Sequence, residues 1–513
     1  MECYNIFEVM MVLIIILKLV LVIFNRASKP TKKMPPGPYP YPIIGNILEL
    51  GQKPHQSLFN LSKIYGPLMT LKLGSLNALV ISSPQIAKEA LTKHDIAFSN
   101  REVPDITRAL DHHKVSLVWS PICDHWRTLR KLCSTNIFSP QKLESTSTLR
   151  HKKVRELVDF LSTCSSKGEA IDIGEVVFTT IMNSLSNTLF SMDFTQYETR
   201  DDGFQNFKGT VESIMVDAGK ANVADLFPLL RFLDPQGIRK RGDEITQKLL
   251  KVFGDIFDER MLLKTSSNKN FEVYDDVLDS FINIIKENSS TELSRHHLLH
   301  LFVDLFVAGI ETTTSTIEWA MTELVHNPKK MARVKEELLQ VLGKDGKPHE
   351  SNISEFHYLN AIVKETFRLH PPVPFLHHKS KSMVEICGFK VPKDTQVLIN
   401  LWAIGRNSST WSDPNSFVPE RFLESKMDVK GFDFGLIPFG AGRRMCPALP
   451  LAHRTVHFIL ASLLHYFDWK IVNGMKPQEL DMSERYGLTI RKAQPLNLVP
   501  ILIEWIGTVE SIR

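Results

Sequence analysis

Most of the chain carries apolar positions at the spacing of amphipathic helices. Apolar residues recur with the helical period between residues 84 and 369 and again over residues 449–467. The clearest helix covers residues 295–325 and should end at Asn327-Pro328, because proline cannot continue a helix. Alternation around Gly74-Ser75 predicts a hairpin, and three further short stretches are strand candidates: residues 385–391, 396–401 and 487–490. We predict a fold that is mainly α with minor antiparallel β.

The N-terminus departs from this pattern. Residues 6–24 are almost all apolar, interrupted by Lys18, and are long enough to span a bilayer. Acidic residues precede the segment and basic residues follow it: Glu2 and Glu8 before, Arg26, Lys29, Lys32 and Lys33 after. The basic flank should stay in the cytosol. We predict an uncleaved anchor at residues 1–25; a cleaved secretory signal would need a basic start and a small-x-small site, and neither is clear.

A proline-rich stretch at residues 35–42 follows the anchor. Such a sequence is stiff and extended, so we interpret residues 26–45 as a basic, proline-rich hinge between membrane and body. Residues 46–513 contain no repeat and no low-complexity linker. We expect them to form one catalytic domain.

Composition narrows the possible functions. A net charge of +4 over 513 residues is too small to indicate a nucleic-acid partner. The six cysteines are scattered without a CxxC pair, which favours a reducing compartment. No glycine-rich strand–helix turn and no phosphate loop is present, so we expect no flavin or NADPH site within this chain. Any electrons must then come from another protein.

Cys446 lies in a glycine-containing loop that runs from Phe439 into the helix of residues 449–467. Pro447 suits the first position of a helix, which would place Cys446 at a helix N-terminus, where the helix dipole favours a thiolate. A thiolate held in this way can serve as the proximal ligand of a haem iron. The alternative for a lone cysteine is a buried structural residue.

The long helix contains Glu311 and Thr312 next to Gly309. Glycine and the run of hydroxyl residues at 312–316 should loosen the helix here, and an acid beside an alcohol suits proton delivery during oxygen activation. The alternative is an ordinary helix whose threonine hydroxyls bond to carbonyls one turn earlier.

The loop Phe-x-x-Gly-x-Arg-x-Cys resembles the haem-binding signature of the cytochrome P450 monooxygenases. Segments 308–314, 367–372 and 402–406 are similar to plant microsomal members, particularly those that hydroxylate monoterpenols and abietane diterpenoids. The resemblance implies the cytochrome P450 fold and haem b, with Cys446 as iron ligand and Glu311 and Thr312 as catalytic residues. It also implies an apolar terpenoid substrate, and between the two skeletons we expect the diterpenoid.

The same resemblance implies roles for other residues. Haem would be bound through Phe439, Arg444, Cys446, and the Trp126/Arg130 pair on one helix face, with His378 as a further propionate contact. Glu365, Arg368 and Arg421 would form a buried structural triad. Four segments would line the substrate pocket: residues 98–120, 302–313, 373–375 and 488–490.

The resemblance finally implies partners and a location. Electrons would come from NADPH-cytochrome P450 reductase, with cytochrome b5 as an optional second partner. The protein would be a single-pass endoplasmic reticulum membrane protein with a cytosolic catalytic domain, contacting membrane lipid and no nucleic acid. Two rivals stay open: a haem-thiolate isomerase or dehydratase acting without O2, and a non-catalytic haem-binding protein.

Overall fold

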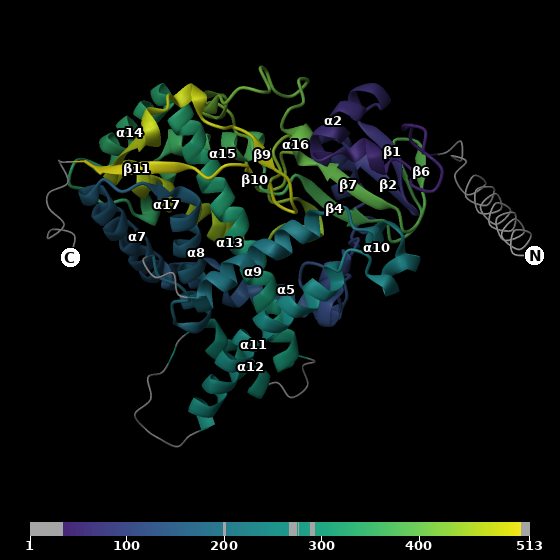
Figure 1. Cartoon of the computed structure of the whole chain (residues 1–513), viewed down its shortest axis with the longest axis horizontal. Coiled ribbons are helices and arrows are strands. Elements are labelled where there is room, and N and C mark those ends of the chain that lie inside the picture. The colour runs from purple at the N-terminus through teal and green to yellow at the C-terminus, as the bar shows by residue number, and fades with distance from the viewer. Residues whose placement is uncertain (1–33, 198–201, 266–273, 275, 288–292, 504–513) are drawn as a thin grey trace, which may run out of the picture. The chain divides into compact units, whose positions relative to one another are not determined.

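The computed structural model describes residues 34–197, 202–265, 274, 276–287 and 293–503 (Figure 1). The expected anchor at residues 1–25 and its basic flank lie outside these residues. The chain divides into two compact units, each assembled from separate segments. Of the described residues, the smaller unit comprises 34–102, 221–236 and 375–404, and the larger comprises those within 103–220, 237–374 and 405–503.

A four-stranded sheet organises the smaller unit. Its strand order is β1-β2-β7-β4, and the bounds are β1 Leu68–Leu73, β2 Leu76–Ile81, β7 Gln396–Asn400 and β4 Phe375–Lys379. The expected hairpin is confirmed as β1–β2, but β2 and β7 run parallel, so the sheet is mixed and not purely antiparallel. The stretch at 385–391 forms a second hairpin, β5 Val384–Ile386 and β6 Phe389–Val391. The remaining elements are η1 Ile47–Leu50, α2 Pro54–Tyr65, α3 Pro84–Lys88, η2 Glu89–Lys93, α10 Val223–Leu226, η4 Pro228–Leu233 and α16 Leu401–Ile404.

The proline-rich stretch lies against β1 and does not stand free as a spacer. The carbonyl of Pro36 accepts the Thr70 N–H at 2.9 Å, and the carbonyl of Ile44 accepts the Gly74 N–H at 3.1 Å. A Cβ added at Gly37 would overlap the Thr70 carbonyl oxygen, so only glycine permits this close approach. Residues 36–46 therefore belong to the folded unit.

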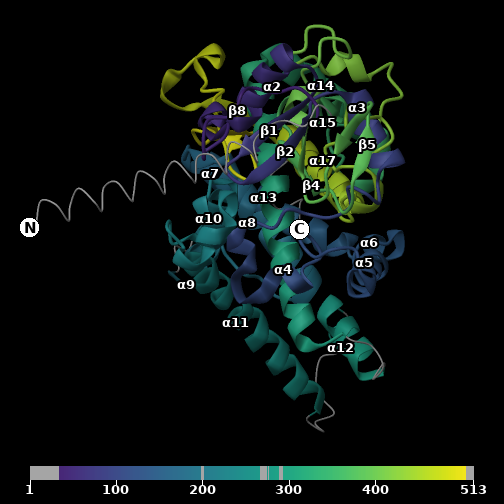
Figure 2. The ribbon, with the colours of Figure 1, turned by 90° about the vertical axis from the view of Figure 1, so that its right-hand side faces the viewer.

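Helices dominate the larger unit, with α13 (Arg295–His326) at its centre. α13 packs against α8 (Ile173–Phe190), α15 (His357–Leu369) and α17 (Leu449–Tyr466) (Figure 1). Figure 2 shows α11 (Ile238–Thr265) running alongside the N-terminal part of α13. Both long helices predicted from the sequence are confirmed within one residue, and α13 ends where Asn327-Pro328 was expected to end it. Among the residues that the structure describes, α13 alone has the length and apolarity of a membrane span, but most of it is buried in the core.

The other elements of the larger unit surround this bundle. The remaining helices are η3 Asp105–Asp111, α4 His112–Val115, α5 Asp124–Asn136, α6 Pro140–Ser145, α7 Ser147–Lys167, α9 Asp202–Gly219, α12 Val277–Glu287, α14 Pro328–Leu342, η5 Glu350–Ser354, η6 Pro419–Phe422, η7 Gly442–Arg444, η8 Val472–Gly474 and η9 Pro477–Glu479. The strands are β3 Ile171–Asp172, β8 Phe467–Ile471 and β11 Asn497–Leu502 in one sheet, and β9 Glu484–Arg485 with β10 Arg491–Lys492 in another. The predicted strand at residues 487–490 is wrong, because these residues form the turn between β9 and β10.

Candidate functional site

The Cys446 loop folds back on itself before α17 begins. Gly440 and Gly442 have φ values of 73° and 67°, a left-handed conformation that favours glycine. The Cys446 N–H then donates to the Phe439 carbonyl at 2.9 Å. Pro447 was expected at the first helical position, but it lies in a turn; α17 begins at Leu449, and Pro450 occupies its first turn instead. Cys446 therefore precedes the helix by a short turn.

The surroundings of the Cys446 sulfur have opposing effects on the pKa of its thiol. Burial raises the pKa of the thiol, because a thiolate loses its hydration, whereas the N–H groups of Ala448 and Leu449 and the charge of Arg130 lower it. The amides expected at the helix end are present, yet the balance without a metal favours the thiol. A directly coordinated metal cation supplies the charge that reverses this balance.

α5 brings two expected residues to the same place. The guanidinium of Arg130 lies 5.9 Å from the centre of the Trp126 ring, and that of Arg444 lies 4.8 Å from it. Arg444 also donates to the Ser120 carbonyl at 2.6 Å. The two guanidinium groups can bind the anionic groups of a cofactor. The Cys446 sulfur can bind the metal of the same cofactor. The donor set of this loop therefore fits haem.

Trp126 has a protein partner in this structure. Its indole N–H donates to the Leu117 carbonyl at 2.9 Å, and an indole has a single N–H. The expected contact of Trp126 with haem stays a prediction. Phe439, also expected near the cofactor, packs edge-on against Phe367 with the ring centres 5.3 Å apart.

α13 is unbroken where the sequence suggested loosening. Thr312, Thr313 and Thr314 each donate to the carbonyl four residues earlier, at 2.8 to 2.9 Å, so the hydroxyls bond within the helix without interrupting it. Ala308 is exposed although most of this helix is buried, and Thr312, one turn later on the same face, is partly exposed. Apart from the two ends of α13, this face is the part of the helix that protein side chains leave uncovered.

Glu311 points to different partners from its neighbour. It is buried and forms an ion pair with Arg491 on β10, and Arg491 also contacts Glu212 on α9 at 3.2 Å. Burial raises the pKa of Glu311 to about 7 and outweighs the opposing effect of Arg491. The carboxyl is thus close to the balance between its two protonation states at neutral pH. No motif in the sequence marks Arg491 or Glu212.

The expected structural triad is present. Arg368 donates two hydrogen bonds to the carboxylate of Glu365 at 2.7 and 2.8 Å, and Arg421 donates a third at 3.1 Å. Arg368 also donates to three backbone carbonyls of the following loop: Gly405, Pro414 and Ser416. Both members of the Glu365–Arg368 pair are fully buried, so each compensates the charge of the other inside the protein.

His378 belongs to β4 in the smaller unit. It is buried, and its Nδ1–H donates to the Phe98 carbonyl at 2.8 Å. Its expected contact with a haem propionate stays a prediction.

The segments expected to line the substrate pocket are partly brought together. The Leu488 N–H donates to Met215 on α9 at 3.0 Å, and the Ile490 carbonyl accepts the Ser315 hydroxyl of α13 at 2.6 Å. Phe302 and Phe306 were expected in the pocket, but they are fully buried in an aromatic cluster with Phe190 and Phe253. Periodicity marked these side chains as buried without revealing what they face.

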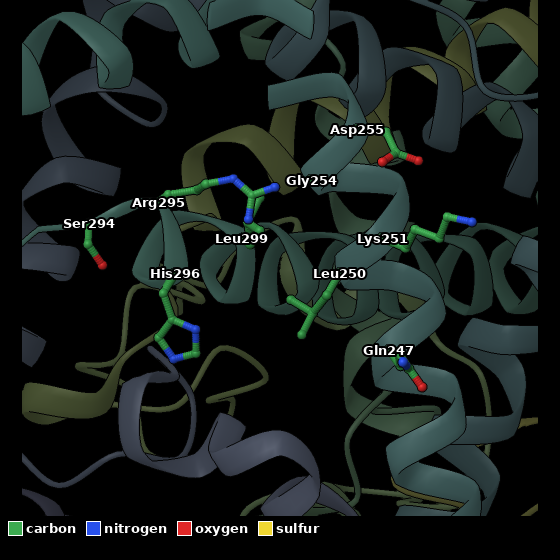
Figure 3. Close-up of a pocket in the computed structure, with 9 residues that line it drawn as sticks. All are labelled: Gln247, Leu250, Lys251, Gly254, Asp255, Ser294, Arg295, His296 and Leu299. Carbon is green, nitrogen blue, oxygen red and sulfur yellow. The ribbon is translucent and has the colours of Figure 1, made fainter. Parts of the chain in front are cut away.

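A cavity of about 700 Å³ lies elsewhere in the larger unit, between α11 and the start of α13. Figure 3 shows Arg295 extending across it toward Gly254, with His296 and Leu299 on the same side. None of its lining residues belongs to the Cys446 loop or to α5. It is therefore a surface feature separate from the candidate site.

Comparison with known proteins agrees with this site. The family description "Cytochrome P450" matches residues 35–497. The chain is 50% identical over 473 residues to cytochrome P450 76T24 of Catharanthus roseus, covering 91% of this chain and 93% of that protein. It is 48% identical over 478 residues to geraniol 8-hydroxylase of the same species, covering 93% and 96%. It is 47% identical over 476 residues to cytochrome P450 76AD1 of Beta vulgaris, covering 93% and 95%.

Proposed function

This chain belongs to the cytochrome P450 family of haem-thiolate monooxygenases, and we propose that it hydroxylates an apolar terpenoid alcohol. The observation that carries the proposal is its 48% and 47% identity to two geraniol 8-hydroxylases, over 93% of the chain in both cases. The family resemblance seen in the sequence favours an abietane diterpenoid. The names of these two relatives move the proposal to a monoterpenol of the size of geraniol.

We assign the haem contacts to residues of the larger unit. Cys446 would ligate the iron, and Arg130 and Arg444 would neutralise the propionates. The bound haem supplies the iron chemistry that activates O2 for insertion of one oxygen atom into a C–H bond. In the smaller unit, His378 remains the proposed further propionate contact.

Proton supply is proposed for two residues of α13. The Thr312 hydroxyl, on the partly exposed face of the helix, would hold a proton at its Oγ1 atom. The Glu311 carboxyl, with its pKa raised to about 7, would take up and release a proton near neutral pH. Arg491 stays charged and would hold the carboxyl in place, and the half-exposed Glu212, paired with the same Arg491, lies at the solvent side of this cluster.

Electrons would come from NADPH-cytochrome P450 reductase, with cytochrome b5 as an optional second partner. Arg127, Lys131 and Arg443 are exposed on or beside the elements that form the candidate haem site, and would attract an acidic partner. Salt should then lower turnover by screening this attraction. Residues 1–25 would anchor the protein in the endoplasmic reticulum membrane, with its catalytic domain in the cytosol.

Product analysis tests the proposed substrate. The purified full chain, reconstituted with the reductase in lipid, would be given NADPH and separate samples of geraniol, an abietane diterpene, lauric acid and cinnamic acid. We expect hydroxylation of geraniol, mainly at one position and with minor products at others, because an apolar site binds the hydrocarbon skeleton and has no partner for a carboxylate. Turnover of either acid without turnover of a terpenoid would contradict the proposal. Turnover without the reductase would contradict the electron source.

A further inference from the structure

The backbone is strained at the end of η3, where the segment that leads to α5 begins. Leu110 and Asp111 are consecutive and have φ values of 46° and 59°, a conformation that residues with a Cβ rarely adopt. Such backbone persists only where surrounding contacts fix it, and it concentrates in segments with a functional role. The contacts that hold this segment come from α11 and α13.

Asp304 of α13 makes the main attachment. Its buried carboxylate accepts the Leu117 N–H at 2.7 Å, the Ser116 hydroxyl at 2.8 Å and the His112 Nε2–H at 3.1 Å. All three donors lie within six residues of the same segment. One carboxylate therefore fixes both the end of the strained turn and the backbone that follows it.

Two histidines extend this attachment. A carboxylate can only accept, so His112 carries its proton on Nε2, and its Nδ1 then faces His300 Nδ1 at 2.9 Å. His300 is fully buried, and its ring lies 4.5 Å from that of His296, which lines the cavity between α11 and α13 (Figure 3). The negative charge of Asp304 thus sets the orientation of His112.

α11 holds the strained turn from its other side. Asp243 accepts the Leu110 N–H at 3.1 Å. A Cβ added at Gly242 would lie 2.8 Å from the Ile106 carbonyl oxygen, so glycine permits α11 to approach this closely. Two carboxylates on two helices therefore hold consecutive parts of residues 110–117.

The segment of residues 110–120 also contacts the candidate haem site. The carbonyl of Leu117 accepts the indole N–H of Trp126, and the carbonyl of Ser120 accepts a guanidinium N–H of Arg444. The backbone that Asp304 holds through the Leu117 N–H is thus the backbone that positions Trp126 and Arg444.

We propose that Asp304 is a positioning residue that fixes residues 105–120, and through them the regioselectivity of oxidation. The bonds of Asp304 to His112, Ser116 and Leu117 support the first part, that Asp304 fixes the segment. Its effect on regioselectivity rests on the proposed function, because it requires a terpenoid substrate beside this segment. The two parts need separate measurements.

Hydrogen exchange of the haem-loaded full chain tests the first part. In Asp304→Ala, amides of residues 112–120 should exchange about tenfold faster or more, because a buried bond to a charged acceptor is lost. Asp304→Asn should give a smaller increase, because its amide oxygen can still accept the Leu117 N–H. Asp258→Ala, which removes an exposed ion pair between α11 and Arg295, is the matched control and should leave this segment unchanged. Unchanged exchange in both Asp304 variants would overturn the proposal.

Product ratios test the second part. With geraniol, Asp304→Asn and Ser116→Ala should shift the ratio of oxidised positions by about threefold or more, a change worth roughly one lost hydrogen bond. If Asp304→Ala does not fold, these two variants supply both measurements. If the wild type does not oxidise geraniol, the proposed substrate fails, while the exchange data still decide the positioning role. Faster exchange with an unchanged product ratio would overturn the regioselectivity part.

Discussion

Glu311 forms an ion pair with Arg491, whereas the hydroxyl of the adjacent Thr312 donates to the Ala308 carbonyl at 2.8 Å. Two neighbouring residues that the sequence groups as an acid–alcohol pair thus have separate partners. Glu311 is tied to β10 and, through Arg491, to Glu212 on α9. Thr312 lies on the partly exposed face of α13. Their contributions should therefore be separable by mutation.

Glu311→Gln should change how stability depends on pH. The pKa of Glu311 is raised from its usual value of 4.5 to about 7, so the folded protein favours the neutral acid. This stabilisation is complete below about pH 4.5 and is lost as pH rises through 7. The wild type should therefore lose roughly 1–3 kcal/mol of unfolding free energy relative to Glu311→Gln between pH 5 and pH 8. Denaturant unfolding at both pH values measures this, with Glu336→Gln at an exposed carboxylate on α14 as control. An equal difference at both values would contradict it.

Thr312→Ala should uncouple the enzyme more than it inactivates it. Loss of the hydroxyl removes one ordered proton donor while leaving the fold intact, because the Ala308 carbonyl keeps its backbone bond. We expect less product and more hydrogen peroxide for each NADPH consumed, so that the ratio of peroxide to product rises about tenfold. Thr316→Ala is a matched control, since Thr316 makes the same type of bond one turn later but is buried. Thr312→Ser should restore most of the coupling; an unchanged ratio in Thr312→Ala would show that the hydroxyl is structural.

Cys446→Ser should abolish the red-shifted Soret band of the reduced carbon monoxide adduct. A serine hydroxyl has about the same size but does not supply the thiolate that produces the shift. The absorption spectrum of the purified protein measures this. Cys133→Ser is the control, because Cys133 is a buried thiol on α5 whose pKa is raised to about 12. A band that survives in Cys446→Ser would place the iron ligand elsewhere.

Arg368→Leu should be strongly destabilising. It leaves the buried Glu365 carboxylate with fewer donors and three carbonyls without their guanidinium, a loss of about 3–5 kcal/mol. Lys430→Gln, which removes an exposed pair with Asp428, should change stability by less than about 1 kcal/mol. Chemical unfolding and the yield of haem-loaded protein measure both. A loss in Arg368→Leu no larger than in the control would contradict a structural role for the triad.

Local sequence features predict the elements of this fold well. The hairpin β1–β2 follows from alternation around Gly74-Ser75. α13 and α17 follow from long apolar periodicity, with a proline stop after α13. The Cys446 loop follows from its spacing of glycine, arginine and cysteine. In each case the residues that decide the structure are close together in the chain.

Long-range pairing could not be predicted in the same way. Arg491 meets Glu311 across 180 positions of sequence, and no local pattern relates them. The parallel pairing of β2 with β7 is similarly distant. Phe302 and Phe306 show the limit of periodicity, which separates buried from exposed faces but not core from pocket. The uninterrupted course of α13 through its threonines depends on hydroxyl orientation, which sequence alone does not determine.

The packing of residues 36–46 on β1 has a consequence for the behaviour of the protein in solution. β1 is the outermost strand of its sheet, and these residues occupy backbone groups that it would otherwise offer to a strand of another molecule. A chain that begins at residue 34 lacks the apolar residues 6–24 and should remain monodisperse. A chain beginning at residue 47 should aggregate at concentrations the longer form tolerates, which light scattering would detect. The proline-rich stretch would then prevent the β1 edges of two molecules from pairing with each other.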